Sequence, residues 1–583
     1  MQYSKEFQNL LELLDSDDET NIELALLLAE NHQEEFKTHF GYSVEEYREL
    51  IEFLNAYNYP HYGKKLKKIQ HIGITSRNIN TIPKAIGILS NVVTLQFNYC
   101  PIEYLPESIG ELSGLITLNL TQCSIKALPE SIGKLKKLET LQITSSALES
   151  LPESIGDLKA LKNLGILWNN ELSDCPDSFN FLENLESLNL SGNALSNLSS
   201  LEKLKKLIVL NLSYNHLKQL PQSLKNLTSL RNLDFSRNLL ETLSEGFEQL
   251  HNLQILSLKY NKITSLPENI GNLTNLITLD LEDNQLKTLP KSFGNLYKLI
   301  NLNLVNNKLE SLPKTFGKKI FGNTLALDRI ELQNNQLTEL SEYFGELEKL
   351  KYLDVQNNQI QSLPENFGNL KSLNYLNLKN NQIQKLPDSF HDLKALRKLD
   401  LSQNQIEDFN FLLDIKDLSF LTLSHNKLNT LPDSIGKLHN LAVFNIMQNH
   451  ISELPESFFE LQKLTELHLD NNRLSLLSDK ISNFQHLTVL NLEHNALEQL
   501  PESIGTLKKL RRLALSDNKL ETLPESIGEL ENLQTLTLEG NVLKSFPQSI
   551  KNLKNLKKLK LRQTGLNIKE IKPYIPAGCK VYI

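Results

Sequence analysis

Hydrophobic residues recur along most of the chain with a period of mostly 23 residues. The repeated unit reads Leu-x-Leu-x-x-Asn-x-Leu-x-x-Leu-Pro-x-x-Ile/Phe-Gly-x-Leu-x-x-Leu. The hexamer LPESIG occurs five times, starting at residues 105, 128, 151, 500 and 523. Of the 20 prolines, 16 directly follow the fourth leucine of a unit. We count 22 units, and a period of this length is typical of proteins that stack their repeats.

Each column of the unit predicts a local structure. Leu-x-Leu alternates with a period of two, so both leucines point to one side, as in a short strand with one buried face. Proline cannot donate a hydrogen bond to a neighbouring strand, and the Leu-Pro pair therefore ends the strand. The segment that follows has helical or 3₁₀ spacing. We predict an α/β solenoid of about 22 repeats, with a concave parallel β-sheet and short helices or 3₁₀ turns on the convex side.

An asparagine occupies the sixth position of the unit from the fifth repeat onward. A carboxamide both donates and accepts hydrogen bonds, so it can satisfy backbone groups at a buried turn. We therefore predict a structural ladder rather than a ligand site. The column is expected to begin at Asn170, in a unit whose first leucine falls near residue 165, and to continue through Asn193, Asn215, Asn238, Asn261 and Asn284 to Asn541.

With these motifs the chain resembles the leucine-rich-repeat superfamily. The Leu-Pro-x-x-Ile-Gly motif is similar to the intracellular variant found in many bacterial repeat proteins and in Ras-pathway scaffolds of the Shoc/Sur class. The resemblance covers about residues 70–565. It implies a right-handed horseshoe or superhelix whose concave sheet binds protein partners, but it does not specify the partner.

Both ends of the chain depart from the repeat. Residues 1–64 contain three helical patterns, at residues 7–14, 22–29 and 43–54, and the last opens with the capping box Ser43-x-x-Glu46. Because a solenoid needs atypical caps, we expect a helical N-terminal cap at 1–64, with a separate docking module as the alternative. The solenoid is expected at 65–565. A C-terminal cap with a short helix and a closing strand is expected at 566–583.

Composition narrows the possible environments and partners. The net charge is −8, whereas a protein that binds nucleic acid or an anionic membrane surface needs a dense cluster of basic residues. No apolar run reaches the roughly 18 residues of a membrane span. The acidic N-terminus lacks the apolar core of a signal peptide, and four cysteines do not make a disulfide framework. We expect a cytoplasmic protein that binds neither nucleic acid nor membrane and has no cofactor.

Candidate catalytic chemistry is sparse. The chain has no Gly-rich phosphate loop, no His-Glu-x-x-His and no Cys-x-x-Cys. His468 and His494 fall in consecutive repeats, but an open sheet offers no water-excluding cleft for an acid–base site. Cys100 and Cys123 occupy the asparagine column of early repeats, where structural thiols are favoured over a zinc site. We expect no catalytic residue and no metal site.

The positions in front of the asparagine column suggest a binding surface in the first half of the chain. Exposed aromatic and arginine side chains are common anchors of protein interfaces, although large residues also occur by chance in a long repeat. Two registers, one residue apart, fit the sequence around Trp168. The predicted protein-binding residues are Tyr99, Trp168, Tyr214, Arg237, Lys259, Tyr260, Asp280, Glu282 and Asp283.

Repeats 12 to 17 carry neutral amides at the same positions. Such amides can hydrogen-bond a glycan or a peptide backbone, or they can simply keep the surface soluble. The alternative ligand-binding residues are Gln333, Gln356, Asn380, Gln403 and Gln448. One repeat is 28 residues long, and its extra residues at 317–323 are either a surface bulge or a functional loop.

These observations favour a non-catalytic scaffold or adaptor that binds a protein of unknown identity on its concave face. A glycan or peptide sensor that uses the amide-rich repeats is one alternative. A regulatory subunit that holds an enzyme is another. The sequence leaves the oligomeric state open.

Overall fold

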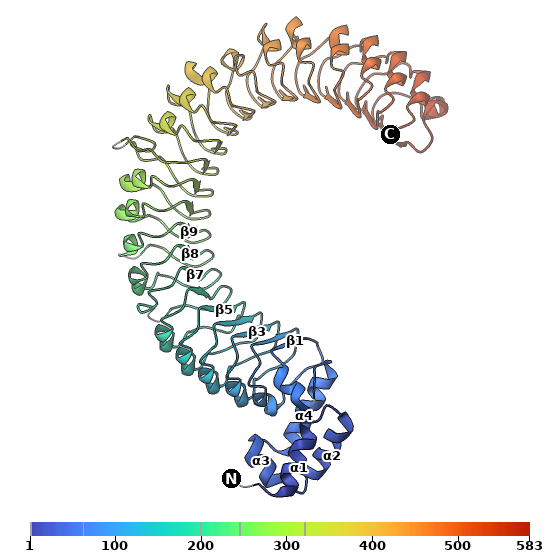
Figure 1. The fold of residues 1–583 in the computed structure, drawn as a ribbon. Coiled ribbons are helices and arrows are strands. Elements are labelled where there is room, and N and C mark those ends of the chain that lie inside the picture. Colours follow the sequence, from blue (N-terminus) through green and yellow to red (C-terminus); the bar gives the residue numbers. More distant parts are fainter. Residues whose placement is uncertain (1–2, 62, 199–200, 244–245, 320–321) are drawn as a thin grey trace. The chain divides into compact units, whose positions relative to one another are not determined.

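The computed structural model describes residues 3–61, 63–198, 201–243, 246–319 and 322–583. The chain divides into two compact units, unit 1 at Met1–Asn284 and unit 2 at Gln285–Ile583. Within each unit, short parallel strands line the inner side of the curve and 3₁₀ turns line the outer side (Figure 1). Among the described residues, no helix is both long enough and apolar enough to cross a bilayer.

Unit 1 opens with four helices rather than the three that the sequence pattern predicts. They are α1 (Lys5–Leu14), α2 (Glu19–Ala29), α3 (Gln33–Phe40) and α4 (Val44–Ala56). Helix α3 was missed because Phe36 is its one buried residue, so it carries almost no hydrophobic periodicity. The predicted capping box is present at α4, where the Ser43 hydroxyl accepts from the Glu46 N–H at 3.1 Å.

The leucine repeat of unit 1 forms parallel strands in the predicted register. Leu95 pairs with Leu118, and Leu118 with Leu141, so equivalent leucines form one buried row. The strands are β1 (His71–Thr75), β2 (Thr94–Asn98), β3 (Thr117–Thr121), β4 (Thr140–Thr144), β5 (Asn163–Leu167), β6 (Ser187–Asn189), β7 (Val209–Asn211), β8 (Asn232–Asp234), β9 (Ile255–Ser257) and β10 (Thr278–Asp280).

Unit 2 continues the same repeat and ends as the sequence predicts. A short helix, α5 (Ile568–Ile571), precedes a closing strand that pairs in parallel with its neighbour. The strands are β11 (Asn301–Asn303), β12 (Arg329–Glu331), β13 (Tyr352–Asp354), β14 (Tyr375–Asn377), β15 (Lys398–Asp400), β16 (Phe420–Thr422), β17 (Val443–Asn445), β18 (Glu466–His468), β19 (Val489–Asn491), β20 (Arg512–Ala514), β21 (Thr535–Thr537), β22 (Lys558–Lys560) and β23 (Lys580–Tyr582).

The Leu-Pro-x-x-Ile-Gly motif builds the outer turns. Pro106 precedes the 3₁₀ turn Glu107–Glu111, in which Ile109 is buried. A Cβ on Gly110 would lie 2.3 Å from the backbone oxygen of Ser131 in the next repeat, so only glycine lets adjacent turns approach this closely. The motif therefore sets the spacing of the repeats on their outer side.

The core of each unit is a column of stacked apolar side chains. The leucines of the strands and turns are almost all buried. In unit 2 the Ile/Phe position of the motif also forms a row of phenylalanines with ring centroids 6.0 to 6.2 Å apart. This row consists of Phe293, Phe316, Phe344, Phe367 and Phe390.

The insertion at 317–323 is described only in part, because Ile320 and Phe321 lie outside the described residues. Its first residue, Gly317, has a φ of 91° and accepts a hydrogen bond from the Thr324 hydroxyl at 3.0 Å. Lys319 forms an ion pair with Glu348 at 2.8 Å. The role of this insertion stays a prediction.

Candidate functional site

The asparagine column forms the predicted hydrogen-bonded ladder. Asn238 illustrates the pattern, since its Nδ2 donates to the carbonyl of Leu212 at 2.9 Å and to that of Phe235 at 3.1 Å. Its Oδ1 accepts from the Leu217 N–H at 3.0 Å. Each carboxamide thus satisfies backbone groups of its own repeat and of the preceding one. The same role holds for Asn193, Asn215, Asn261 and Asn284.

In the fifth repeat the predicted ladder residue is wrong by one position. Asn169, not Asn170, is buried, and its Oδ1 accepts from the Ser146 N–H at 3.2 Å. Asn170 is exposed. The strand register agrees, because Leu164 pairs with Leu141. Two adjacent asparagines in the sequence allowed either alignment, and the structure resolves it.

Two early cysteines take the place of asparagine in the ladder. The Cys123 thiol donates to the Phe97 carbonyl at 3.4 Å, and the Cys100 thiol to the Asn98 carbonyl at 3.3 Å. Burial raises the pKa of Cys123 to about 11, which keeps the thiol protonated at neutral pH. Among the described residues no three histidine, cysteine or acidic side chains form a group that could hold a metal ion.

The residue directly before the ladder position has a left-handed backbone in every repeat from the second to the last. For residues other than glycine, φ lies between 51° and 59°. We call this position the left-handed slot. It holds Tyr99, Gln122, Ser145, Trp168, Gly192, Tyr214, Arg237, Tyr260 and Asp283 in unit 1, and Asn306, Asn334, Asn357, Asn380, Gln403, His425, Gln448, Asn471, His494, Asp517, Gly540 and Gln563 in unit 2.

Backbone preference explains most occupants of the slot in unit 2, but it does not explain the bulky occupants in unit 1. Glycine, asparagine, aspartate and histidine tolerate this conformation best, whereas bulky side chains are strained there. Unit 2 uses mostly the tolerated types. Unit 1 instead places large aromatic side chains and an arginine in the slot. Strain of this kind is often retained at functional sites.

Four of these bulky residues touch one another and form what we call the aromatic ladder: Trp168, Tyr214, Arg237 and Tyr260. The ring centroids of Trp168 and Tyr214 lie 5.0 Å apart. The Arg237 Cζ lies 5.0 Å from the Tyr214 ring centroid and 4.0 Å from that of Tyr260. Trp168 and Tyr214 remain 45% and 44% exposed. The aromatic ladder is therefore a continuous, solvent-facing stack across several repeats.

Gly192 makes the contact between Trp168 and Tyr214 possible. It occupies the slot between them, with a φ of 72°. A Cβ at this position would lie 2.4 Å from the Trp168 ring. Because Gly192 has no side chain, the Trp168 indole can extend over the sixth repeat and contact Tyr214. Sequence reasoning overlooked Gly192, although a glycine between two aromatic residues in one column was a readable signal.

The charged residues predicted for this surface adjoin the end of the aromatic ladder. The Tyr260 hydroxyl donates to Glu282 at 3.2 Å, and the pKa of Tyr260 is raised chiefly by the charge of Glu282. Lys259 forms an ion pair with Asp280 at 3.5 Å, and burial raises the pKa of Asp280. Asp283 occupies the next slot.

Tyr99 does not join the cluster. It occupies the same column and is exposed, but Gln122 and Ser145 fill the two slots between it and Trp168. The structure therefore brings the other predicted binding residues together and leaves Tyr99 apart.

The amides of unit 2 bond to one another. Nδ2 of Asn334 donates to Asn306 at 2.6 Å, Asn357 donates to Asn334 at 2.7 Å, and Asn380 donates to Asn357 at 2.9 Å. Gln403 and Gln448 occupy later slots, and Gln333 and Gln356 lie one residue before the slot. The four asparagines of this row, Asn306, Asn334, Asn357 and Asn380, thus use part of their hydrogen-bonding capacity on one another.

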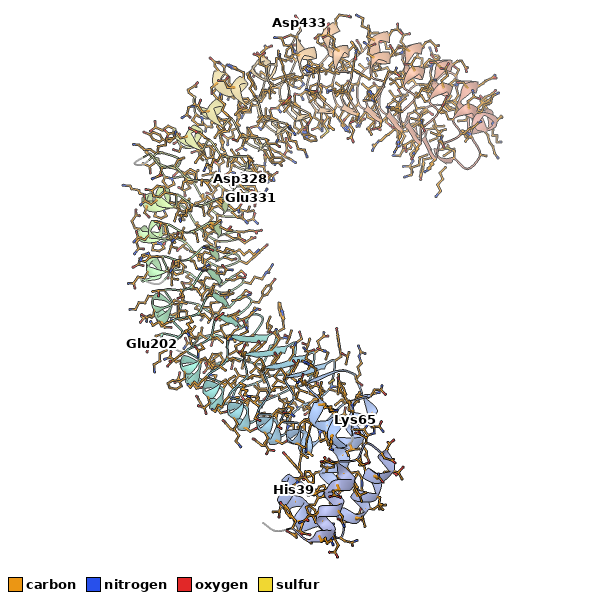
Figure 2. All side chains as sticks on the ribbon, viewed as in Figure 1. His39, Lys65, Glu202, Asp328, Glu331 and Asp433 are labelled. Carbon is orange, nitrogen blue, oxygen red and sulfur yellow. The ribbon has the colours of Figure 1, made fainter. Side chains whose placement is uncertain are left out.

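A second aromatic stack, in unit 2, was not predicted. The Arg329 Cζ lies 3.6 Å from the Tyr352 ring centroid, and the rings of Tyr352 and Tyr375 stack at 4.3 Å. Arg329 also forms an ion pair with Glu331, which Figure 2 labels together with Asp328. These residues belong to the column just before the first leucine, which the leucine pattern does not single out.

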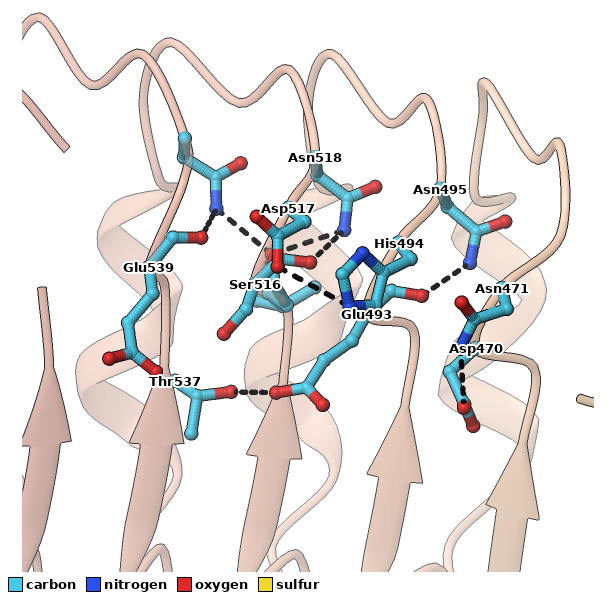
Figure 3. A network of polar contacts seen from close by, with 12 residues as sticks. Asp470, Asn471, Glu493, His494, Asn495, Ser516, Asp517, Asn518, Thr537 and Glu539 are labelled. Carbon is cyan, nitrogen blue, oxygen red and sulfur yellow. Dashed lines mark hydrogen bonds and ion pairs between the residues drawn. The ribbon is translucent and has the colours of Figure 1, made fainter. Parts of the chain in front are cut away.

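His468 and His494, in consecutive repeats, have separate partners, and Figure 3 shows that of His494. Nε2 of His494 lies 3.4 Å from Asp517 of the next repeat, whereas His468 lies 3.7 Å from Glu466. Glu493 accepts from the Thr537 hydroxyl at 2.6 Å instead of meeting either histidine. These contacts give no convergent acid–base pair.

Comparisons with known proteins agree with this architecture. A family model described as a leucine-rich repeat region matches residues 115–254, 241–341, 323–407, 394–479 and 471–572. A search of curated proteins finds no match.

Solved structures with this fold come from plants and bacteria. A plant peptide hormone receptor in complex with RGF2 is 26% identical, with a TM-score of 0.62, and the match covers 87% of this chain and 89% of that one. The Arabidopsis receptor kinase HAESA, in complex with the peptide hormone IDA and the co-receptor SERK1, is 28% identical with a TM-score of 0.62 and coverages of 84% and 86%. YopM from Yersinia enterocolitica is 23% identical with a TM-score of 0.57 and coverages of 92% and 99%, and it shows the fold alone.

The periodic leucines, the asparagine ladder, the parallel strands and the family match all describe one architecture. The chain belongs to the leucine-rich repeat family.

Proposed function

We propose that unit 1 binds a polypeptide partner through the aromatic ladder, and that the chain serves as a non-catalytic scaffold in the cytoplasm. One observation carries the proposal. Trp168, Tyr214, Arg237 and Tyr260 occupy a left-handed slot that disfavours bulky residues, yet they form a continuous exposed stack. Neither the ladder of asparagines nor the leucine core requires these side chains.

The chemistry of the aromatic ladder suits a polypeptide. Tyrosine and tryptophan offer large apolar faces at a small cost in side-chain entropy. The Arg237 guanidinium stacks between two rings, and such a planar group can donate several hydrogen bonds from its edge. The neighbouring carboxylates of Glu282 and Asp283 can meet donors on the partner. The surface thus offers apolar contacts, donors and acceptors side by side.

The plant receptor complexes support a peptide as the contacting element. One, at 28% identity, is a complex with the peptide hormone IDA, and the other, at 26% identity, is a peptide hormone receptor in complex with RGF2. The amide-rich alternative has less support, because Asn334, Asn357 and Asn380 already bond within their row and because the left-handed backbone accounts for their residue type.

A peptide-display selection against the full chain tests the proposal. Peptides are selected on the wild type, and their Kd is then measured for the wild type and for the double variant Tyr214→Asn, Tyr260→Asn. Asparagine is the residue that unit 2 prefers in this slot, so the fold is retained while the rings are removed. Two interface anchors of this kind contribute about 2 kcal/mol each, and we expect the Kd to rise by about 100-fold or more.

The matched control places the same kind of change in the amide row. The double variant Asn357→Ser, Asn380→Ser alters two equivalent slots in unit 2 and should leave the Kd unchanged. Loss of binding in this control, with retention in the tyrosine variant, would instead place the site in the amide-rich repeats.

A further inference from the structure

Charge is distributed very unevenly along this chain. Residues 1–60 contain 14 acidic and three basic residues, a net charge of −11. Residues 551–583 contain nine basic residues and one acidic residue, a net charge of +8. The 490 residues at 61–550 contribute only −5 to the total of −8. The near-neutral average therefore conceals two strongly and oppositely charged regions.

The positive region forms one surface on the last strands of unit 2. Arg512 on β20, Lys558 on β22 and Lys580 on β23 lie in one register row, with Thr535 on β21 between the first two. All three cations are exposed. We call this surface the basic end, and it also includes Arg511, Lys557 and Arg562.

Little within the chain neutralises the basic end. Lys560 forms an ion pair with Glu539 at 3.4 Å. In the part of the chain that the structure describes, none of the other eight cations at 551–583 forms such a pair. Beside them, Tyr582 and Ile583 present apolar surface, and Ile583 is 62% exposed. The basic end is therefore a cationic surface with an apolar component.

The negative region carries the complementary features. On α2, Leu24, Leu27 and Leu28 are exposed, with Leu27 at 61%. Their spacing places them on one face of the helix. Glu19 and Glu23 are exposed on the same helix. We call these five residues the leucine stripe with its acidic border. A contiguous exposed apolar stripe of this kind is characteristic of an interaction surface.

We propose that the basic end of one copy binds the acidic N-terminal helices of a second copy of this chain. In that contact the leucine stripe packs against Tyr582 and Ile583, and the carboxylates of its border face Arg512, Lys558 and Lys580. Charge complementarity selects this occupant, because the chain itself supplies a surface of opposite sign with a matching apolar centre. Nucleic acid or anionic lipid would satisfy the basic end but leave the leucine stripe uncovered.

The contact joins two different surfaces, so it is heterologous. Each copy that binds through its basic end still offers a free acidic end, and association proceeds to rings or open chains rather than stopping at a symmetric dimer. Because most of the charges are exposed, added salt should weaken the contact strongly. This self-association is independent of the partner proposed for the aromatic ladder.

Sedimentation velocity on the full chain tests the inference. At about 50 mM NaCl the weight-average sedimentation coefficient should rise with protein concentration, and at about 500 mM NaCl it should stay at the monomer value. A chain that remains monomeric at every concentration at low salt contradicts the proposal.

Charge reversal identifies the two surfaces. The triple variant Lys557→Glu, Lys558→Glu, Lys580→Glu and the double variant Glu19→Lys, Glu23→Lys should each weaken self-association by about 10-fold or more, because like charges then face each other. An equimolar mixture of the two variants should associate again, since each now complements the other. A mixture that stays monomeric overturns the proposal and leaves nucleic acid or lipid as the occupant of the basic end.

Two further variants separate the contact from general effects of charge. Lys137→Glu, Lys218→Glu, Lys262→Glu changes the net charge by the same amount at exposed positions elsewhere and should leave association intact. Leu24→Gln, Leu27→Gln removes the apolar centre without changing charge and should weaken association. Equal effects of the control and the basic-end variant would show that net charge alone governs association.

Discussion

At the scale of the residue, neighbouring side chains in one repeat have opposite roles, and their sequence gives no hint of which is which. Asn169 and Asn170 are adjacent and chemically identical. Asn169 is buried and joins two repeats through hydrogen bonds to backbone groups, whereas Asn170 faces solvent. The difference arises from the register of β5, which is fixed by pairing with its neighbours.

This assignment predicts that alanine substitutions at Asn169 and Asn170 have different effects on the free energy of unfolding. Asn169→Ala should lower the free energy of unfolding by about 1–3 kcal/mol, because buried backbone groups lose their partner. Asn170→Ala should change it by less than about 0.5 kcal/mol. Denaturant unfolding of both variants measures the difference, and equal losses would reject this register of β5.

Thiol chemistry provides a second residue-scale prediction. Burial raises the pKa of Cys123 to about 11 and that of Cys175 to about 12, so both remain protonated and inaccessible near pH 8. Cys579 is partly exposed. A thiol reagent should modify Cys579 of the folded chain first, although burial also raises the pKa of this thiol, and should modify all four cysteines after unfolding. Rapid modification of Cys100 or Cys123 in the folded chain would contradict the ladder role.

At the scale of the element, the backbone of the turn after each strand limits which side chains can occupy the exposed left-handed slot. Its left-handed slot favours small or amide side chains, and unit 2 follows that preference. Unit 1 departs from it where Trp168 crosses Gly192 to reach Tyr214. Gly192 is thus a positioning residue for the aromatic ladder.

Two glycines in equivalent slots allow a matched test. Gly192→Ala and Gly540→Ala each place a side chain at a positive φ, and each should lower stability by about 1–3 kcal/mol. Only Gly192→Ala displaces Trp168, because the new Cβ at position 540 meets the Asp517 side chain instead. Peptide affinity should therefore fall in the first variant alone. Equal affinity in both variants would remove Gly192 from the site.

Most strands and turns were predictable from the sequence, because the positions of apolar residues in the repeat indicate which side chains are buried. The strands and the outer turns follow from apolar spacing and proline position, and the hydrogen-bonded ladder follows from the asparagine column. Helix α3 did not, since it buries only Phe36. The left-handed slot and the Arg329–Tyr352–Tyr375 stack were also missed, because hydrophobic periodicity carries no information on φ or on contacts between exposed positions.

At the scale of the whole molecule, a repetitive scaffold leaves few positions free to carry function. Leucines, asparagines and motif glycines are committed to the core and to the spacing of the repeats. The aromatic ladder in unit 1 and the charged surfaces near the two ends are not required by that scaffold. We therefore expect separate surfaces for a polypeptide partner and for self-association.

Independence of the two surfaces can be measured. At about 500 mM NaCl, where self-association should be lost, the affinity for a selected peptide should fall by less than about 10-fold, because stacking and apolar contacts are only weakly screened. Isothermal titration calorimetry at about 50 mM and about 500 mM NaCl gives the ratio of the two Kd values. A peptide that binds only to the associated form would show that the surfaces are coupled.

The most direct test of the central claim uses the protein's own reporter. The chain has one tryptophan, Trp168, and it lies in the aromatic ladder. Titration with a peptide selected on the wild type should shift or quench the Trp168 emission with the same Kd that calorimetry gives. The Tyr214→Asn, Tyr260→Asn variant should show no saturable change over the same range. Binding that leaves the Trp168 emission unchanged, with equal affinity in the variant, would contradict the account.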